Sequence, residues 1–221
     1  MSLQTLKLRD GADRRLRGGH LWIYSNEVDT AATPLKNFAA GEQVVVENNR
    51  GKALGIAYVN PNTLICGRIV SRDLKHVLDR SLLVHRLNIA LSLREACFDA
   101  PCYRLVYGDS DGLSGLVIDR FMDIFVVQVS TAGMEAVLED IVDALNKVFR
   151  PKAILLRNDG KMRDMEGLET YTEIVQGDLP DLCPLEENGV PLLAPLQKGQ
   201  KTGWFYDHRE NRAQMQKHVK G

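Results

Sequence analysis

Short strand-like stretches, closely spaced and divided by turn residues, constrain the fold of the first third of the chain most strongly. Leu6 and Leu8 alternate with charged residues, which is the period of a half-buried strand. Polar turns at 48–51 and 60–62 separate the apolar runs that follow. Strands are therefore expected at residues 6–8, 43–47, 53–59 and 63–71. This spacing predicts a small β-barrel.

An arginine cluster precedes the second part of this barrel. Arg14, Arg15 and Arg17 fall on one expected helical turn, which a Gly18-Gly19 pair ends. The chain has a net charge of −1, yet up to residue 75 it has eleven Lys and Arg against seven Asp and Glu. This asymmetry favours a polyanionic partner for the first part, and a merely solvated surface is the alternative. We expect the three arginines to contact phosphates.

Two aromatic side chains follow the arginines at strand period. His20 and Trp22 alternate with Leu21 and Ile23, so they share one side of an expected strand. Aromatic rings beside cations can stack on unpaired RNA bases. For Trp22, burial in the core is the favoured interpretation, because large aromatic residues are mostly buried, and RNA stacking is the other.

The middle of the chain has the pattern of a mixed α+β domain. Apolar residues share one helical face within 76–97, where Arg80, Arg86 and Arg94 lie at other positions and are expected to be solvated. A second apolar stripe predicts a helix over 134–149. Strands are expected at 104–107, 116–119, 124–129, 153–156 and 171–175. The Asn188-Gly189 pair predicts a β-hairpin, so we expect helices alternating with β-hairpins.

Several kinds of site find no support in the sequence. The acidic loop that starts at Asp109 would need a glutamate at its twelfth position to be an EF-hand, and that position is Arg120. No Cys/His cluster has zinc spacing, and no G-x-G-x-x-G or Walker loop is present. The four cysteines are expected to be free thiols in a reducing cytoplasm, because no apolar run resembles an export signal or a membrane span. No catalytic residue and no metal ligand is assigned.

The run Gln200–Arg212 combines an amide, several cations and three adjacent aromatic residues. Asp207 and Glu210 have the spacing of a capping box, which predicts that a helix begins at Asp207. The run is too polar for a core strand and too aromatic for a plain linker. It reads as a segment that leads into a further structural unit.

The first part of the chain resembles a PUA domain, a small RNA-binding barrel found on many RNA-modifying enzymes. The residues that carry the resemblance are Arg14–Tyr24, Gly41–Val45 and Gly51–Gly55. The whole chain is similar to the N-terminal portion of a bacterial family of S-adenosylmethionine (SAM)-dependent methyltransferases that modify carbon 5 of a cytosine in large-subunit (23S) ribosomal RNA. Arg104–Arg120, Glu187–Gly189 and Gln200–Arg212 carry that similarity.

The resemblance implies a division into three parts. Residues 1–75 would form the PUA domain, 76–195 a central α+β domain, and 196–221 the lead-in to a Rossmann-like methyltransferase domain that this chain is expected to lack. On that basis the chain is expected to bind ribosomal RNA but neither SAM nor a membrane, and not to catalyse. The family's covalent chemistry needs a cysteine thiolate that adds to carbon 6 of the cytosine. None of Cys97, Cys102 and Cys183 matches its position.

The same resemblance adds binding residues near the end of the chain. Lys201, Arg209 and Arg212 become candidates for contact with RNA phosphates or the cofactor. They join Arg14, Arg15, Arg17, His20 and Trp22 as the expected RNA-binding residues. The sequence leaves open whether the chain forms a homodimer. The alternative function is that of a stand-alone PUA-type RNA-binding protein.

Overall fold

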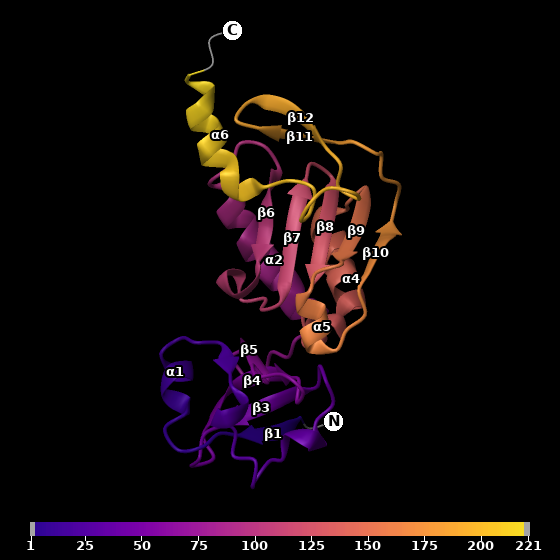
Figure 1. Ribbon diagram of the computed structural model, residues 1–221. Helices are drawn as coiled ribbons and strands as arrows, with labels where there is room; N and C mark the ends of the chain where they lie inside the picture. Colours follow the sequence, from indigo (N-terminus) through magenta and orange to yellow (C-terminus); the bar gives the residue numbers. More distant parts are fainter. Residues whose placement is uncertain (1–2, 219–221) are drawn as a thin grey trace.

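The computed structural model describes residues 3–218, and its two five-stranded sheets lie in separate parts joined end to end (Figure 1). The first sheet has the order β1-β3-β4-β5-β2, with β1 and β3 parallel. Its strands are β1 (Gln4–Lys7), β2 (Trp22–Ile23), β3 (Gln43–Glu47), β4 (Ala53–Val59) and β5 (Gly67–Ser71). The helix α1 (Asp13–Arg17) and the 3-10 turns η1 (Ser25–Glu27) and η2 (Leu35–Asn37) lie between them.

Alternation along the strands builds the core of this first part. Val44 and Val46 of β3 are fully buried, and Leu16 of α1 and Ile23 of β2 pack in the same cluster. The strand expected at 63–71 begins only at Gly67. Residues before it form a turn instead, in which the Thr63 hydroxyl donates to the Ile65 carbonyl at 2.9 Å.

The second sheet is continuous, with the order β10-β9-β8-β7-β6. Its strands are β6 (Cys102–Tyr107), β7 (Leu116–Phe121), β8 (Ile124–Val129), β9 (Ala153–Asn158) and β10 (Tyr171–Gln176). The expectation of helices alternating with separate β-hairpins is wrong. β8 and β9 are parallel, and a crossover through α3 (Ala132–Glu135) and α4 (Leu138–Phe149) connects them. Local periodicity detects such strands but not their pairing, because a crossover has no turn signature.

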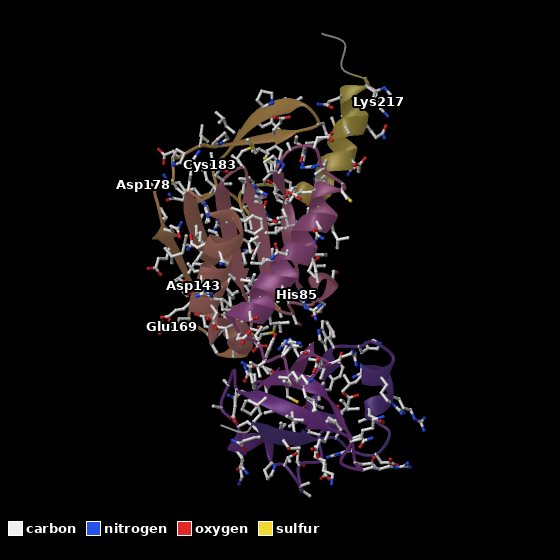
Figure 2. The ribbon with its side chains drawn as sticks, turned by 180° about the vertical axis from the view of Figure 1, so that it is seen from behind. His85, Asp143, Glu169, Asp178, Cys183 and Lys217 are labelled. Atoms are coloured by element: carbon white, nitrogen blue, oxygen red, sulfur yellow. The ribbon has the colours of Figure 1, made fainter. Side chains whose placement is uncertain are left out.

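Two helices cover one face of this sheet, as the view from behind shows (Figure 2). α2 (Arg80–Glu95) begins where the Asp79 carboxylate accepts a hydrogen bond from the Leu82 amide at 2.9 Å. Its buried Leu83 and Leu87 pack in one cluster with Ile141 and Leu145 of α4 and with the inward residues of the strands. Burial of each such side chain contributes about 1.5–3 kcal/mol.

The opposite face carries the end of the chain. The Asn188-Gly189 turn has φ angles of 54° and 74°, and it joins β11 (Cys183–Glu187) to β12 (Val190–Ala194), so the hairpin predicted from this pair is confirmed. η4 (Tyr206–His208) and α6 (Arg209–Gln216) follow. Tyr206 packs on Phe121 of the sheet, with ring centroids 5.2 Å apart.

A tyrosine from the first sheet joins the two parts. Tyr58 of β4 is fully buried, and its hydroxyl donates to the Ser114 carbonyl at 2.7 Å and lies 3.0 Å from the Thr131 hydroxyl. Its ring covers Gly133, where an added Cβ would lie 2.0 Å from the Tyr58 Cγ. Burial raises the pKa of Tyr58 to about 12, so the hydroxyl stays a neutral donor.

A buried ion pair crosses the same junction. Glu166, at the end of α5 (Met162–Glu166), lies 3.0 Å from Arg68 of β5 and accepts a hydrogen bond from the Asn60 amide at 2.8 Å. The Ala132 amide also points at this carboxylate, at 3.3 Å. Both charges of the Arg68–Glu166 pair are buried, so removing either partner would strongly destabilise the junction.

Candidate functional site

Four exposed residues form the first candidate surface, which we call the α1–β2 surface: Arg14, Arg17, His20 and Trp22. Trp22 is 38% exposed, so the interpretation that it belongs to the core is wrong. It lies on β2 opposite Arg68 of β5, while its neighbour Ile23 takes the inward position. Two exposed cations, His20 and the exposed Trp22 thus lie within residues 14–22.

Arg15 differs from the other two arginines because its guanidinium is already engaged. It lies 2.8 Å from the Glu27 carboxylate and 4.9 Å from the centre of the Tyr24 ring. Arg17 pairs with the mostly buried Asp13 carboxylate at 3.3 Å, but its own side chain is 60% exposed, against 38% for Arg15. Arg14 and Arg17 are thus the more available cations, and Arg15 holds η1 against α1.

The second candidate surface is a cleft of about 360 Å³ where α2, β6 and the run Gln200–Arg212 meet. We call it the C-terminal cleft. Cations and aromatic rings dominate its lining, which consists of Arg94, Phe98, Tyr103, Arg104, Tyr107, Lys201, Tyr206, Asp207 and Arg209. Such a lining can stack a base and attract a phosphate.

Buried Asp119 anchors one side of this cleft. It accepts two hydrogen bonds from Arg104, at 2.8 and 3.0 Å, and one from the Thr202 hydroxyl at 2.6 Å. The hydrogen bond with Asp119 raises the pKa of Arg104 above its ordinary value. Thr202 is itself fully buried, so this contact ties the Gln200–Arg212 run to the central sheet.

A second buried carboxylate, Glu187 of β11, anchors the other end of the run. Its side chain is 1% exposed, and it accepts from Arg212 at 2.9 Å and from the Trp204 indole at 3.1 Å. Arg209 lies 3.5 Å from the same carboxylate and stacks on Phe98. The structure therefore brings Arg209 and Arg212 together, but in contacts within the protein.

The capping box predicted at Asp207 is wrong. Asp207 lies in η4 and the residue before α6 is His208, whose side chain makes no capping hydrogen bond. The Asp207 carboxylate lies 3.4 Å from the Lys201 ammonium group instead. Lys201 is about half exposed and sits 4.4 Å from the centre of the Phe205 ring, which makes it the most accessible of the three cations expected here.

Other residues of the cleft escaped the sequence interpretation. Arg94, expected to be solvated, is mostly buried and lies 2.7 Å from Asp111. Tyr107 is 58% exposed, with the Arg104 guanidinium 5.3 Å from its ring centre. The sequence held one signal for Tyr107. This residue directly precedes the glycine of a turn-rich loop at the end of a strand, where binding residues often lie.

The anchoring role of Glu187 predicts a pH dependence. Burial acts to raise the pKa of Glu187, but the hydrogen bonds from Arg212 and Trp204 outweigh it, so its pKa is lowered. A depressed pKa stabilises the folded state above the ordinary glutamate pKa of about 4.3, and this is lost as the pH falls through the lower folded value. We expect Glu187→Gln to lower the free energy of unfolding by about 1–3 kcal/mol at pH 7.

Urea titrations from pH 7 to pH 3 measure this effect. The difference in the free energy of unfolding between the wild type and Glu187→Gln should shrink as the pH falls below about 4.3. The exposed neighbour Glu186→Gln is the matched control and should show little change at either end of the range. A difference that is constant with pH would contradict the assignment.

Comparisons with known proteins found a family model and curated relatives similar to this chain. A family model of the PUA-like domain matches residues 6–72. "Ribosomal RNA large subunit methyltransferase I" of Aliivibrio fischeri is 34% identical over 220 residues, which are 98% of this chain and 55% of that protein. The protein of the same name from Erwinia tasmaniensis is 35% identical over 223 residues, with the same coverage. The chain thus spans about half the length of the curated relatives it matches.

Solved structures share the fold. The crystal structure of SMU.776, described as a methyltransferase complexed with SAH, matches with a TM-score of 0.78 and 20% identity, over 96% of this chain and 53% of that one. A SAM-dependent methyltransferase from Streptococcus mutans matches with a TM-score of 0.76 and 20% identity, over 96% and 54%.

These matches correct the expected fold class. The expectation that the methyltransferase fold is missing from this chain is wrong, because nearly the whole chain has the fold of part of two methyltransferases. The five-stranded sheet with its β8–α4–β9 crossover belongs to that fold. The chain carries a PUA-like domain and is similar, along almost its entire length, to the ribosomal RNA large subunit methyltransferases.

Proposed function

We propose that this chain recognises RNA within a SAM-dependent methyltransferase that modifies carbon 5 of a cytosine in 23S ribosomal RNA, in the cytoplasm. The observation that carries the proposal is the α1–β2 surface, where Arg14, Arg17, His20 and Trp22 are exposed together on the PUA-like domain. Arginines contact phosphates there and Trp22 stacks on an unpaired base. The similarity to ribosomal RNA large subunit methyltransferases supports the RNA substrate.

The proposal keeps three parts, residues 1–75, 76–195 and 196–221. A hydrophobic cluster around Val44 supports the first part, and a second cluster around Leu87 lies mostly in the second part but also contains Ile56, Tyr58 and Val70. The third part docks on the second through Thr202 and Trp204. Lys201, Arg209 and Arg212 then lie beside RNA that reaches the C-terminal cleft, with Lys201 as the phosphate contact and the two arginines holding the run in place.

The described residues do not fit SAM at the parallel crossover. Nucleotide-like cofactors bind at the carboxyl end of such a strand, next to the following helix. Here the Tyr58 ring fills that corner over Gly133.

The comparisons give no support to the expectations that the chain binds no SAM and does not catalyse, since almost all of it matches methyltransferases. When bound, SAM supplies the methyl group.

Two thiols of this chain do not suit the covalent step of cytosine methylation. Burial raises the pKa of Cys66 to about 11, and burial also raises the pKa of Cys183. Both groups are therefore protonated at neutral pH, whereas the attacking group in this chemistry is a thiolate. No step of the transfer is assigned to them, and the role that we propose for the described residues is RNA recognition.

The proposal predicts a salt-dependent loss of RNA binding when the α1–β2 surface is altered. Each phosphate contact adds about 0.9 to the slope of log K against log salt concentration on duplexes and about 0.7 on single strands. Arg14→Ala/Arg17→Ala should therefore lower the slope by about 1.4–1.8 and weaken binding to a 23S ribosomal RNA fragment at low salt at least tenfold. Fluorescence anisotropy at several salt concentrations measures both quantities.

The matched control removes the same charge elsewhere in the first part. Arg50→Ala/Lys52→Ala changes two exposed cations on the β3–β4 turn. This control variant should have the same slope of log K against log salt concentration as the wild type, within experimental error. Equal slopes for the two double variants would contradict a specific role of the α1–β2 surface, and absence of RNA binding by the wild type would overturn the proposed function.

A further inference from the structure

A groove separates the two parts of the molecule on the side of α2. It has a volume of about 440 Å³ and is lined by β5 on one side and α2 on the other, with Arg72, Arg86, Ile89 and Leu93 among its residues. A neighbouring hollow of about 450 Å³ shares Arg72 and Arg86 with it and extends toward His85. Figure 2 shows His85 on α2 at the end of the helix nearest the first sheet.

Two guanidinium groups in this groove have no carboxylate partner among residues 3–218. Arg72 donates only to the His20 carbonyl, at 3.2 Å. Arg86 lies over Gly112, with its Nη1 3.0 Å from where an added Cβ would stand, and its Nε is buried without a hydrogen-bond partner within the described range. Buried donors of this kind normally bond to a protein group or to ordered water, and no group among residues 3–218 serves the Arg86 Nε.

The carboxylates near the groove already have partners. Asp111 lies 2.7 Å from Arg94 and accepts from the Tyr107 amide, and Asp109 accepts from the Ser114 hydroxyl. Asp73 lies 3.6 Å from His76 at the far end. Arg94 therefore balances Asp111, whereas Arg72 and Arg86 line the groove without a carboxylate partner among residues 3–218.

We propose that this interdomain groove binds a backbone phosphate of the RNA strand held by the α1–β2 surface, with Arg72 and Arg86 as its ligands. The inference rests on the proposed function and extends the RNA path from the first domain onto α2. Arg72 makes the connection, because it bonds to the carbonyl of His20, which belongs to the α1–β2 surface. Exposed Ile89 and Leu93 form an apolar surface for the RNA strand beside the phosphate.

RNA binding by the full chain, with a 23S ribosomal RNA fragment as the probe, tests this site. Arg72→Gln and Arg86→Gln should each weaken binding about 5- to 30-fold and lower the salt slope by about 0.7–0.9. Arg80→Gln is the matched control, because Arg80 lies on the same helix but pairs with Asp143 at 3.4 Å. It should bind as the wild type does.

A second measurement uses the unaltered protein. Phenylglyoxal modification read by mass spectrometry should show that RNA protects Arg86 and leaves Arg80 reactive. If the wild type binds RNA while the groove variants match Arg80→Gln and Arg86 is not protected, the groove assignment is overturned and the proposed function stands. If the wild type binds no RNA, the proposed function fails first.

Discussion

Asp119→Ala is expected to lower the free energy of unfolding by about 3–5 kcal/mol, the cost of leaving a buried ion pair with one partner. Asp119 is fully buried and accepts hydrogen bonds from Arg104 and from Thr202. Its loss leaves the Arg104 charge without its carboxylate and frees the Thr202 hydroxyl. The Thr202 end of the Gln200–Arg212 run should loosen with it, which changes the surroundings of neighbouring Trp204, while Glu187 still holds the Trp204 indole.

Urea unfolding followed by circular dichroism gives the free energy, and tryptophan fluorescence reports on the run. The matched control is Asp123→Ala, which removes an exposed pair with Lys152 from the turn after the same strand and should cost no more than about 1 kcal/mol. Asp119→Asn keeps an acceptor of the same shape, so its free energy of unfolding should lie between those of Asp119→Ala and Asp123→Ala. Equal stability of Asp119→Ala and Asp123→Ala would refute the anchoring role.

The second large effect is expected at the junction of the two parts. Tyr58→Ala removes a fully buried ring that contacts Gly133 and bonds to Ser114, so it should cost about 3–5 kcal/mol, as large-to-small changes at aromatic core positions do. Because the ring belongs to both parts, their unfolding should also lose cooperativity. Denaturation followed by far-ultraviolet circular dichroism should then show two transitions in place of one.

Tyr58→Phe separates the ring from the hydroxyl. It retains the packing on Gly133 and removes only the donor to the Ser114 carbonyl, so it should cost about 1–3 kcal/mol and keep a single transition. A Tyr58→Ala variant as stable as Tyr58→Phe would show that the ring does not join the two parts.

The two buried carboxylates explain why the C-terminal cleft is a defined surface. Asp119 holds Thr202 and Glu187 holds Trp204 and Arg212, so both ends of the Gln200–Arg212 run are fastened to the central part. Tyr206 of the run then lines the cleft together with Phe98 and Tyr107. This arrangement leaves Lys201 accessible to a ligand while Arg209 and Arg212 support the wall.

Periodicity and turn chemistry predicted many individual elements of this protein. Alternation at 43–47 and 53–59 matches β3 and β4, the apolar stripe at 76–97 matches α2, and Asn188-Gly189 matches a hairpin turn. These succeed because backbone geometry and one-sided burial act within a few residues. The PUA-like part was recognisable for the same reason, since its motifs are local in the chain.

Contacts between distant residues depended on the tertiary structure alone. The parallel pairing of β8 with β9, the exposure of Trp22 and the burial of Arg94 against Asp111 follow from which surfaces meet, and no local pattern encodes that. Asp119 and Thr202 are 83 positions apart, yet they hold the cleft together. The sequence by itself determined many of the elements and their polar faces, whereas long-range packing decided which cations pair with carboxylates, as Arg94 does, and which lack such a partner among residues 3–218, as Arg72 and Arg86 do.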